Sequence, residues 1–330
     1  MSGAEPALSV VAPCYNEEGS LPEFVRRTAA ACEAVVGDDY ELILVNDGSR
    51  DSTWACIRAL ASGNPRIVGL NLSRNHGHQL AVTAGLARAA GARVMIIDAD
   101  LQDPPELLGA LMARMDDGAD VVFARRRRRA SESVFKLITA RLFYRLLRLL
   151  SDVDIPENTG DFRLLSRRIV DRLNEMPEQD RFLRGMVAWL GGVQAEVSYD
   201  RDARFAGKTN YTLGRMVRLA IAGVTSFSTW PLRLAGFMAG IGALSGVGLA
   251  IYVVAGFLVG RAAPGWTSLA LIMIFFATVQ FACLGVMGAY LGRIFMQVKG
   301  RPLYLVDEEI GGGRDRLKDK PQLEAIGGSR

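Results

Sequence analysis

Short runs of apolar residues alternate with longer amphipathic segments through the first 125 residues of the chain. Each run has the length of a buried strand, and each segment between two runs has the length of a helix. This alternation predicts an α/β fold with a doubly wound, Rossmann-like and mostly parallel sheet. The predicted strands are Leu8–Ala12, Glu41–Asn46, Ile67–Leu72, Val94–Asp98 and Asp120–Ala124, and the predicted helices are Ser20–Val35, one starting at Asp51, His78–Ala90 and Pro105–Met115.

The middle of the chain has a different pattern. Ser131–Ser151 carries apolar residues at helical spacing with basic residues between them, which predicts an amphipathic helix that is buried or lies at a membrane interface. Beyond it we expect a loop, two helices and a further strand, over Asp154–Arg163, Ser166–Asn174, Gln179–Leu190 and Val193–Tyr199.

The apolar residues are concentrated toward the C-terminus. Leu213–Trp230 mixes two arginines with apolar residues and predicts an interfacial helix on a membrane surface. Leu234–Gly260 and Thr267–Gly292 contain no charged residue, and each exceeds the roughly 20 residues needed to cross a bilayer core. Two such runs in tandem favour a transmembrane hairpin over helices buried in a globular core.

Basic residues flank this pair of runs, and Arg261 alone lies between them. By the positive-inside rule we expect a multi-pass protein of the inner (plasma) membrane, with the sheet domain and both termini in the cytoplasm. The expected domains are a cytoplasmic domain over 1–212, a juxtamembrane helix over 213–231, two transmembrane helices within 232–293 and a cytoplasmic tail over 294–330, polar and mobile from Asp307.

Charge and cysteine content change this picture little. The 39 Lys and Arg against 35 Asp and Glu leave a net charge of +4, which argues against a nucleic-acid partner. The four cysteines lack paired or zinc-type spacing, and the first nine residues lack the features of a signal peptide. Both observations favour a reduced, cytosol-facing protein.

Candidate chemistry begins where the strand Val94–Asp98 ends. Alternate strand positions point the same way, so Asp98 and Asp100 can converge on one hard cation, and Gln102 can add a third oxygen. A divalent ion held by one or two carboxylates usually completes its shell with substrate phosphates and water. The ligand indicated is a phosphorylated one, such as a nucleoside diphosphate. The alternative is that the two aspartates cap the strand and the next helix.

Other polar residues follow the neighbouring strands. Ligands bind outside the carboxyl ends of strands in a doubly wound sheet, and Tyr15, Asn16, Asp47 and Arg74 fall at those ends together with Asp98. Asp47 can accept N–H groups of a nucleobase or close an Asx-turn. Of the two histidines, His76 and His78, we expect hydrogen-bonding or surface roles rather than metal binding.

Two basic clusters could meet an anion. Arg125–Arg129 precedes the first amphipathic segment, and Arg204 and Lys208 flank Gly207 ahead of the second. Each is a solvated surface or a site for a lipid phosphate, and together they favour an anionic lipid. Asp161 is a general base or a helix N-cap. A phosphate monoester is already largely ionised at neutral pH, so with such an acceptor Asp161 would orient groups more than remove a proton.

Taken together, these segments resemble glycosyltransferase family 2, and within it the polyprenyl-phosphate glycosyltransferases. This group includes dolichyl-phosphate mannose synthases and bacterial undecaprenyl-phosphate glucosyl and aminoarabinosyl transferases, and two membrane helices fit the bacterial branch better. The segments that carry the resemblance are VVAPCYNEEGSL (10–21), VNDGSRDST (45–53), LSRNHGHQLAVTAGL (72–86), DADLQDPPE (98–106), NTGDFRLLSR (158–167) and RFAGKTNY (204–211).

The resemblance implies a GT-A fold and inverting transfer of a sugar from a nucleotide sugar, such as UDP-glucose, to polyprenyl phosphate, often by a homo-oligomer such as a tetramer. The resemblance implies that Asp98, Asp100 and Gln102 bind Mg²⁺ or Mn²⁺, and that Pro13, Tyr15, Glu17 and Asp47, together with Asp98, bind the nucleotide. It implies that Arg126 or Arg125, with Arg204 and Lys208, binds phosphate. The implied catalytic residues are Asp161, as a base or an orienting group, and Asp100. The last motif departs from the family pattern at Thr209-Asn210, where Ser-Lys is more usual.

Two alternatives remain at this stage. A processive polysaccharide synthase normally carries a Gln-x-x-Arg-Trp motif, which Gln179-Asp180-Arg181-Phe182 does not match. A membrane-anchored nucleotide-binding or scaffold subunit would lack catalysis, against which the intact Asp98, Asp100 and Gln102 set argues.

Overall fold

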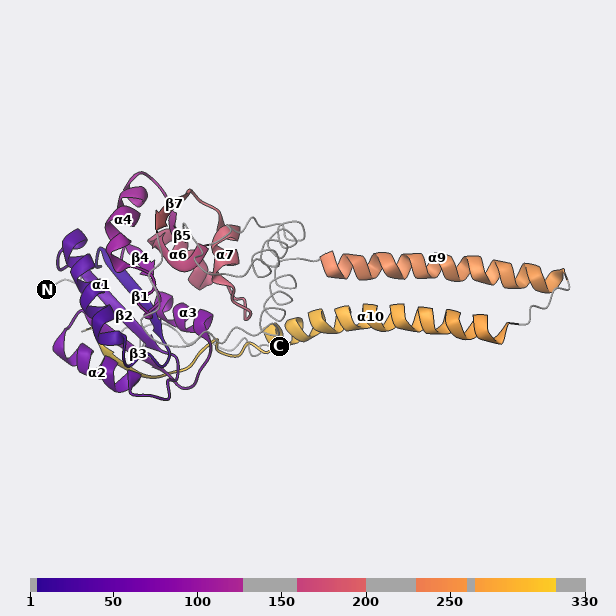
Figure 1. The fold of residues 1–330 in the computed structure, drawn as a ribbon, viewed down its shortest axis with the longest axis horizontal. Coiled ribbons are helices and arrows are strands. Elements are labelled where there is room, and N and C mark those ends of the chain that lie inside the picture. Colours follow the sequence, from indigo (N-terminus) through magenta and orange to yellow (C-terminus); the bar gives the residue numbers. More distant parts are fainter. Residues whose placement is uncertain (1–4, 127–158, 200–229, 260–264, 313–330) are drawn as a thin grey trace, which may run out of the picture. The chain divides into compact units, whose positions relative to one another are not determined.

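The apolar runs of the N-terminal half form the interior strands of one sheet. The computed structural model describes residues 5–126, 159–199, 230–259 and 265–312. These divide into a sheet unit, formed by residues 5–126, 159–199 and 302–312, and a hairpin unit, formed by residues 230–259 and 265–301. Figure 1 shows the elements of both units.

The sheet unit has eight strands in the order β7-β5-β6-β4-β1-β2-β3-β8. Four neighbouring pairs are parallel and three are antiparallel, so the sheet is mixed, with a parallel centre. The strands are β1 (Leu8–Cys14), β2 (Tyr40–Asn46), β3 (Ile67–Leu72), β4 (Arg93–Ile96), β5 (Val121–Arg126), β6 (Thr159–Ser166), β7 (Gln194–Tyr199) and β8 (Val306–Gly311).

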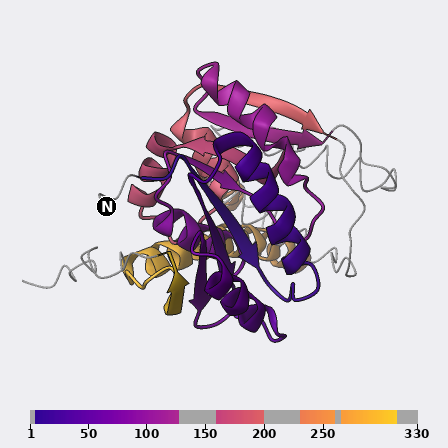
Figure 2. The ribbon, with the colours of Figure 1, turned by 90° about the vertical axis from the view of Figure 1, so that its left-hand side faces the viewer.

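Helices cover both faces of this sheet, which explains why its central strands are mostly apolar and buried at almost every position. Val10 and Ala12 of β1 belong to a core that includes Phe24 of α1, whereas Val11 of β1 faces Gly85 of α3. The helical layers surround the sheet in both views (Figures 1 and 2). The helices of this unit are α1 (Leu21–Val36), α2 (Thr53–Gly63), α3 (His78–Arg88), the 3₁₀ turn η1 (Pro105–Leu107), α4 (Leu108–Asp116), α6 (Arg167–Glu175) and α7 (Leu183–Leu190).

The strand β6 corrects the sequence prediction. The loop expected over Asp154–Arg163 is wrong for residues 159–163, which begin a strand between β4 and β5. Asp161 therefore lies on a strand and is not a helix N-cap. The strand was hidden because it is buried on both faces and still carries Asp161 and Arg163, so its sequence has neither apolar continuity nor clean alternation.

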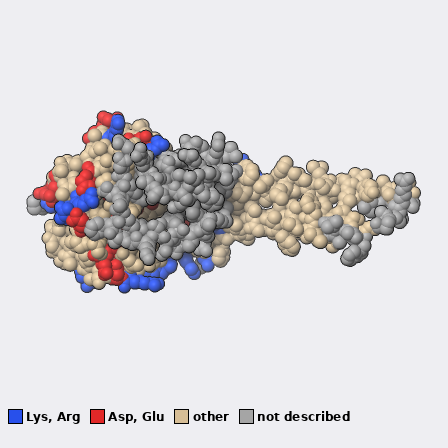
Figure 3. Space-filling model, in the orientation of Figure 1, with Lys and Arg blue, Asp and Glu red and all other residues tan. Residues whose placement is uncertain are grey.

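The hairpin unit consists of α9 (Trp230–Leu258) and α10 (Trp266–Val298). Both are long and apolar enough to span a membrane, over Trp230–Gly256 and Ile272–Val298, and their apolar side chains are largely exposed. The visible faces of the two helices are almost free of charged residues (Figure 3). The helices start and end a few residues from the predicted limits, and α10 extends furthest beyond its prediction. The interfacial helices expected over 131–151 and 213–229 lie outside the described residues.

The chain returns to the sheet directly after α10. The polar, mobile tail expected from Asp307 is wrong for residues 307–311, which form most of β8, antiparallel to β3 at the sheet edge (Figure 2). Backbone pairing begins just before the strand, where Ser73 N–H donates to Leu305 O at 3.0 Å. A short polar segment after a membrane span carries no strand signature, because its partners are residues more than 200 positions earlier.

An ion pair between Arg88 and Glu309 anchors β8. The Nε–Oε1 distance is 2.5 Å, and the two side chains are only 5% and 15% exposed. The neighbouring Glu308 instead pairs with Arg58, where both side chains are about half exposed. A buried charge left without its partner is costly, whereas an exposed pair is screened by water. The strand therefore depends mainly on Glu309.

We expect Glu309→Ala to destabilise the sheet unit by about 3 kcal/mol, because it leaves the Arg88 guanidinium buried with Glu41 as a more distant partner. The thermal unfolding midpoint of the detergent-solubilised chain should fall by roughly 6–12 °C. The matched variant Glu308→Ala should cost less than about 1 kcal/mol. Equal midpoints for the two variants would contradict this assignment.

Candidate active site

A cavity of 280 Å³ lies where β1, β2 and β4 end. Its walls come from four loops that follow parallel strands, so residues distant in sequence meet at one edge of the sheet. Six of the predicted site residues line it: Pro13, Tyr15, Glu17, Asp47, Asp98 and Asp100. Asn75, Gly77 and His78 also line it.

The first wall is the loop between β1 and α1, which is joined to the loop after β2. Asn16 adopts a left-handed conformation with φ of 57°, and its Oδ1 accepts from Arg50 N–H at 2.9 Å. Thr53 Oγ1 accepts from Glu17 N–H at 2.9 Å. These bonds fix the loop backbone, while the Tyr15 side chain remains 42% exposed beside the cavity. An exposed aromatic ring held on a fixed loop can stack on a planar ligand.

Asp47 fixes a second wall. Its carboxylate accepts the backbone N–H groups of His76 at 2.7 Å and Gly77 at 3.0 Å, so it holds the loop between β3 and α3. Burial raises the pKa of this carboxyl although both bonds and the two histidines oppose that shift. Its partners thus lie on another loop. It still lines the cavity, and contact with a nucleobase stays a prediction.

The loop after β4 presents the Asp98 and Asp100 carboxylates. Burial raises the pKa of Asp98 to about 6, opposed by His78 and reinforced by the charges of Asp161, Asp100 and Asp103. Asp98 Oδ1 is buried and has no hydrogen-bond partner among the described residues. Asp100 Oδ1 accepts from Gln102 N–H at 3.1 Å across a turn in which Leu101 has φ of 60°.

These observations fit a divalent cation. An orphaned buried carboxylate oxygen beside a second carboxylate is a hard-ligand pair that lacks its positive charge. Within the described residues, no group of three or more His, Cys, Asp and Glu side chains could hold a metal without a substrate. Two carboxylates would therefore leave most of the coordination shell to phosphate and water. Gln102 is buried and is not among the residues that line the cavity, so its predicted place as a third ligand has less support.

Asp161 lies behind this pair and is surrounded by cations. Arg184 forms a bidentate pair with it, through Nε at 2.8 Å and Nη2 at 3.1 Å, and His78 Nε2 lies 3.1 Å from Oδ2. Burial alone would raise the pKa of Asp161, but the bond to His78 and the arginines Arg184 and Arg163 hold it well below its ordinary value. A carboxylate in this state is a weak proton acceptor and a strong orienting group.

His78 connects the two carboxylate sites. Its Nε2 lies 3.7 Å from Asp98 Oδ1 as well as close to Asp161. Burial lowers the pKa of His78, but the bond to Asp161 and the charges of both aspartates raise it above its ordinary value overall. Sequence reasoning left His78 with a general hydrogen-bonding or surface role and missed Arg184. Arg184 lies on α7, far from any recognised motif, and only folding places it beside Asp161.

The predicted phosphate-binding cations are described in part. Arg125 pairs with Glu196 of β7 at 3.0 Å, and both side chains are about half exposed. Arg126 is the last residue of β5 and lies in register with Tyr199, the last residue of β7. Arg204 and Lys208 lie outside the described residues, in the segment that follows Tyr199.

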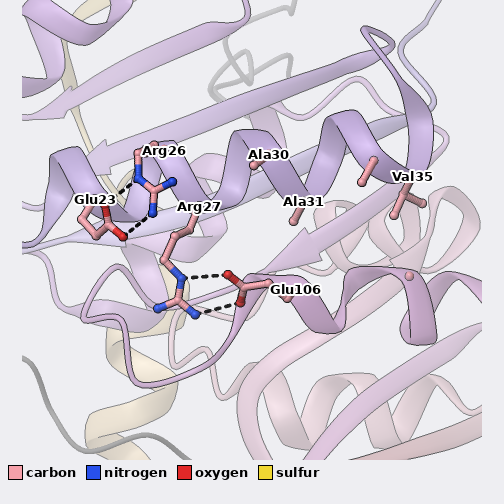
Figure 4. A pocket seen from close by; sticks show the side chains of 9 residues that line it. Glu23, Arg26, Arg27, Ala30, Ala31, Val35 and Glu106 are labelled. Atoms are coloured by element: carbon pink, nitrogen blue, oxygen red, sulfur yellow. Dashed lines mark hydrogen bonds and ion pairs between the residues drawn. The ribbon is translucent and has the colours of Figure 1, made fainter.

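A larger groove of 510 Å³ lies elsewhere, along α1 and the start of α4. Alanines form its floor, and its two arginines are already paired, Arg26 with Glu23 and Arg27 with Glu106 (Figure 4). Its charges are thus neutralised within the groove. The smaller cavity, with its unbalanced carboxylates, is the stronger candidate for chemistry.

The chain's two histidines should shift its stability in opposite directions with pH. The pKa of His78 is raised, so its contribution is fully present below about pH 6.5 and is lost as pH rises through its folded-state pKa. The pKa of His76 is lowered by burial and Arg74, so its cost appears as pH falls. In EDTA, the unfolding midpoint of wild type relative to His78→Gln should therefore decrease from pH 5.5 to 8.5, whereas that relative to His76→Gln should increase. The same trend for both variants would contradict the geometry.

Comparison with known proteins identifies the family. A sequence profile described as Glycosyl transferase family 2 matches residues 9–173. An uncharacterized glycosyltransferase of Bacillus subtilis, YkcC, is 42% identical over 94% of this chain and 96% of its own. The SfII prophage-derived bactoprenol glucosyl transferase of Shigella flexneri is 38% identical over 92% of this chain and 99% of its own.

One solved structure with similarity to this chain is glucosyl-3-phosphoglycerate synthase from Mycobacterium tuberculosis, in complex with Mn²⁺, UDP-glucose and phosphoglyceric acid. It is 25% identical, covers 67% of this chain and 79% of its own, and has a TM-score of 0.46. The profile match and the near full-length relatives establish the family. The chain belongs to glycosyltransferase family 2, and it is a glycosyltransferase with a GT-A-like fold.

Proposed function

We propose that this enzyme transfers glucose from UDP-glucose to a polyprenyl phosphate, such as undecaprenyl phosphate, with inversion at the anomeric carbon. The observation that carries the proposal is a cavity with an unbalanced carboxylate pair, in a chain that also has two apolar helices long enough to span a membrane. Near full-length relatives named bactoprenol glucosyl transferases support the sugar and the lipid. UDP as the carrier rests on resemblance to the bacterial branch.

The donor would occupy the 280 Å³ cavity. Pro13, Tyr15, Glu17 and Asp47 would surround the nucleoside, with Asp98 beside its ribose or diphosphate. Asp98 and Asp100, with Gln102 nearby, would hold Mg²⁺ or Mn²⁺. When bound, the divalent ion would supply positive charge to the departing diphosphate. The buried Asp98 Oδ1, which accepts no hydrogen bond from the described residues, is the observation that supports this assignment.

The acceptor phosphate would meet the basic residues at the ends of β5 and β7. Arg126 or Arg125, together with Arg204 and Lys208, would neutralise it, and guanidinium groups suit phosphate oxygens because they donate two parallel hydrogen bonds. The lipid would stay in the membrane beside the apolar hairpin, which would raise its local concentration at the site.

Asp161 would orient groups rather than remove a proton. A phosphate monoester is mostly a dianion at neutral pH and needs no strong base. Asp161 already accepts two bonds from Arg184 and lies beside His78. These residues would keep the Asp98 carboxylate and the reacting phosphates aligned.

We further propose that the enzyme is a homo-oligomer, such as a tetramer, of the inner membrane, with the sheet unit and both termini in the cytoplasm. The strand β8 supports this topology, because the chain returns from α10 to the sheet unit after two apolar helices. An even number of spans leaves both ends of the hairpin on one side of the membrane.

Transfer should be tested with a panel of nucleotide sugars and undecaprenyl phosphate in detergent, with the lipid-linked product detected by mass. UDP-glucose should give the largest yield, and EDTA should abolish it. Metal-dependent donor binding by calorimetry, without turnover on any polyprenyl phosphate, would favour the non-catalytic scaffold subunit. Product with more than one sugar per lipid would favour a processive synthase.

Asp100→Ala should abolish metal-dependent transfer without unfolding the chain, because it removes one of the two carboxylates that the loop after β4 presents to the cavity. We expect kcat to fall by at least about 1,000-fold and the unfolding midpoint to stay close to wild type. Asp117→Ala, at an exposed carboxylate paired weakly with Arg114, is the matched control and should keep full activity. Full activity in Asp100→Ala would contradict the assigned role.

A further inference from the structure

Asp103 is a buried carboxylate that neither the cavity nor the charge cluster around Asp161 explains. It is 0% exposed, three residues beyond Asp100, and its Oδ1 accepts a hydrogen bond from the Tyr199 hydroxyl, itself on a residue only 5% exposed. Burying a carboxylate is unfavourable unless strong hydrogen bonds compensate. A bond from a hydroxyl to a buried carboxylate is charge-assisted and among the stronger kinds. The Asp103–Tyr199 contact is therefore the fixed end of the loop that carries Asp98 and Asp100.

The loop needs such an anchor because its backbone is strained. Leu101 has φ of 60°, a left-handed conformation that is unfavourable for a residue other than glycine. The strained residue lies between the Asp100 carboxylate and the Asp103 anchor. Conformations of this kind persist only where the surroundings hold them, and they gather at functional sites. Without the anchor, the loop could relax and move Asp100 away from the cavity.

The other end of the contact lies where the basic segments begin. Tyr199 ends β7 and is in register with Arg126, which ends β5 and begins the five-arginine run. The segment with Arg204 and Lys208 follows Tyr199 in the sequence. The Tyr199 ring also packs edge-on against Phe162, next to Asp161, with centroids 6.0 Å apart. One hydroxyl thus joins the carboxylate loop to the strand ends from which both basic clusters depart.

We infer that Tyr199 and Asp103 are positioning residues, which hold the carboxylate loop against the paired ends of β5 and β7. The expected effect on turnover rests on the proposed function, whereas the contact between Tyr199 and Asp103 is independent of it. A misplacement of about 1 Å between reacting groups can reduce a rate about 100-fold. Loss of this contact should therefore reduce turnover far more than it reduces donor affinity.

The same loop has a second attachment, which provides a control. Glu106, at the start of the following η1, forms a bidentate pair with Arg27 of α1 at 2.8 Å (Figure 4). The Glu106 side chain is 54% exposed, so water screens this pair and should replace it when it is broken. The Asp103–Tyr199 bond and the Glu106–Arg27 pair thus attach the same loop, and they differ mainly in that the first is buried and the second is exposed.

The test compares variants of the full chain in detergent. Tyr199→Phe keeps the ring that packs on Phe162 and removes only the hydroxyl, and we expect kcat to fall about 10- to 100-fold with the donor KM within about threefold of wild type. Asp103→Asn keeps an oxygen that can accept from Tyr199, and should retain activity within about threefold, whereas Asp103→Ala should match Tyr199→Phe. Glu106→Gln should stay within about twofold of wild type.

A second measurement does not depend on catalysis. Hydrogen exchange of a peptide covering residues 98–107 should accelerate at least about tenfold in Tyr199→Phe, and less than about twofold in Glu106→Gln. Tyr40→Phe, at another buried tyrosine of the sheet unit, is the matched control and should leave this peptide unchanged. If wild type transfers no sugar but this exchange pattern holds, the proposed function fails and the anchor stands.

Two results would overturn the inference. The first is wild-type turnover and wild-type exchange of residues 98–107 in Tyr199→Phe, which would show that the hydroxyl holds nothing in place. The second is an inactive Asp103→Asn beside a fully active Tyr199→Phe, which would show that the Asp103 charge, and not its bond to Tyr199, is what the enzyme needs.

Discussion

Repulsion between carboxylates at one sheet edge is the constraint on which the active site depends. Asp98 and Asp161 both lie within 4 Å of Nε2 of His78, at 3.7 and 3.1 Å, and Asp100 follows on the same loop as Asp98. Two unit charges 4 Å apart interact by about 4 kcal/mol at an effective dielectric constant of 20. The protein neutralises the inner carboxylate with Arg184 and His78 and leaves Asp98 under-compensated, with a pKa raised to about 6. In the proposed function, this uncompensated negative charge would be balanced by the divalent cation that binds with the donor diphosphate.

The chain passes from the hairpin unit back into the sheet unit through the edge strand β8. The strand β8 follows α10 by a few residues, and Leu305 accepts from the backbone of Ser73, at the start of the loop that Asp47 holds. A sheet edge with unpaired backbone groups is a liability for a protein, and here a segment from beyond the membrane helices covers it. The same strand that closes the sheet therefore connects the hairpin to one wall of the cavity. The buried Arg88–Glu309 pair makes this connection costly to open.

Sequence reasoning identified the parts of the site whose position follows from strand order. Tyr15, Asp47, Asp98 and Asp100 end parallel strands, and parallel strands bring their carboxyl ends together. It could not find Arg184, β6 or β8, because each is defined by partners far along the chain and by burial that reverses the usual polarity pattern. Asp161 illustrates the difference: the residue was identified correctly as a candidate, but its strand, its bidentate arginine and its depressed pKa required the folded chain.

Catalysis in the proposed reaction must then come mainly from placement of charge. An ionised phosphate acceptor already carries its attacking lone pairs, and Asp161, with its pKa held low, has little capacity to take a proton near neutral pH. What remains for the protein is to stabilise charge on the leaving diphosphate and to align the acceptor with it. In the proposed function, both tasks depend on the position of the Asp98–Asp100 loop relative to the ends of β5 and β7, which the basic segments follow in the sequence. The buried hydrogen bond from Tyr199 to Asp103 joins the Asp98–Asp100 loop to the end of β7, which is paired with the end of β5. This link accounts for a buried carboxylate that lies outside the cavity.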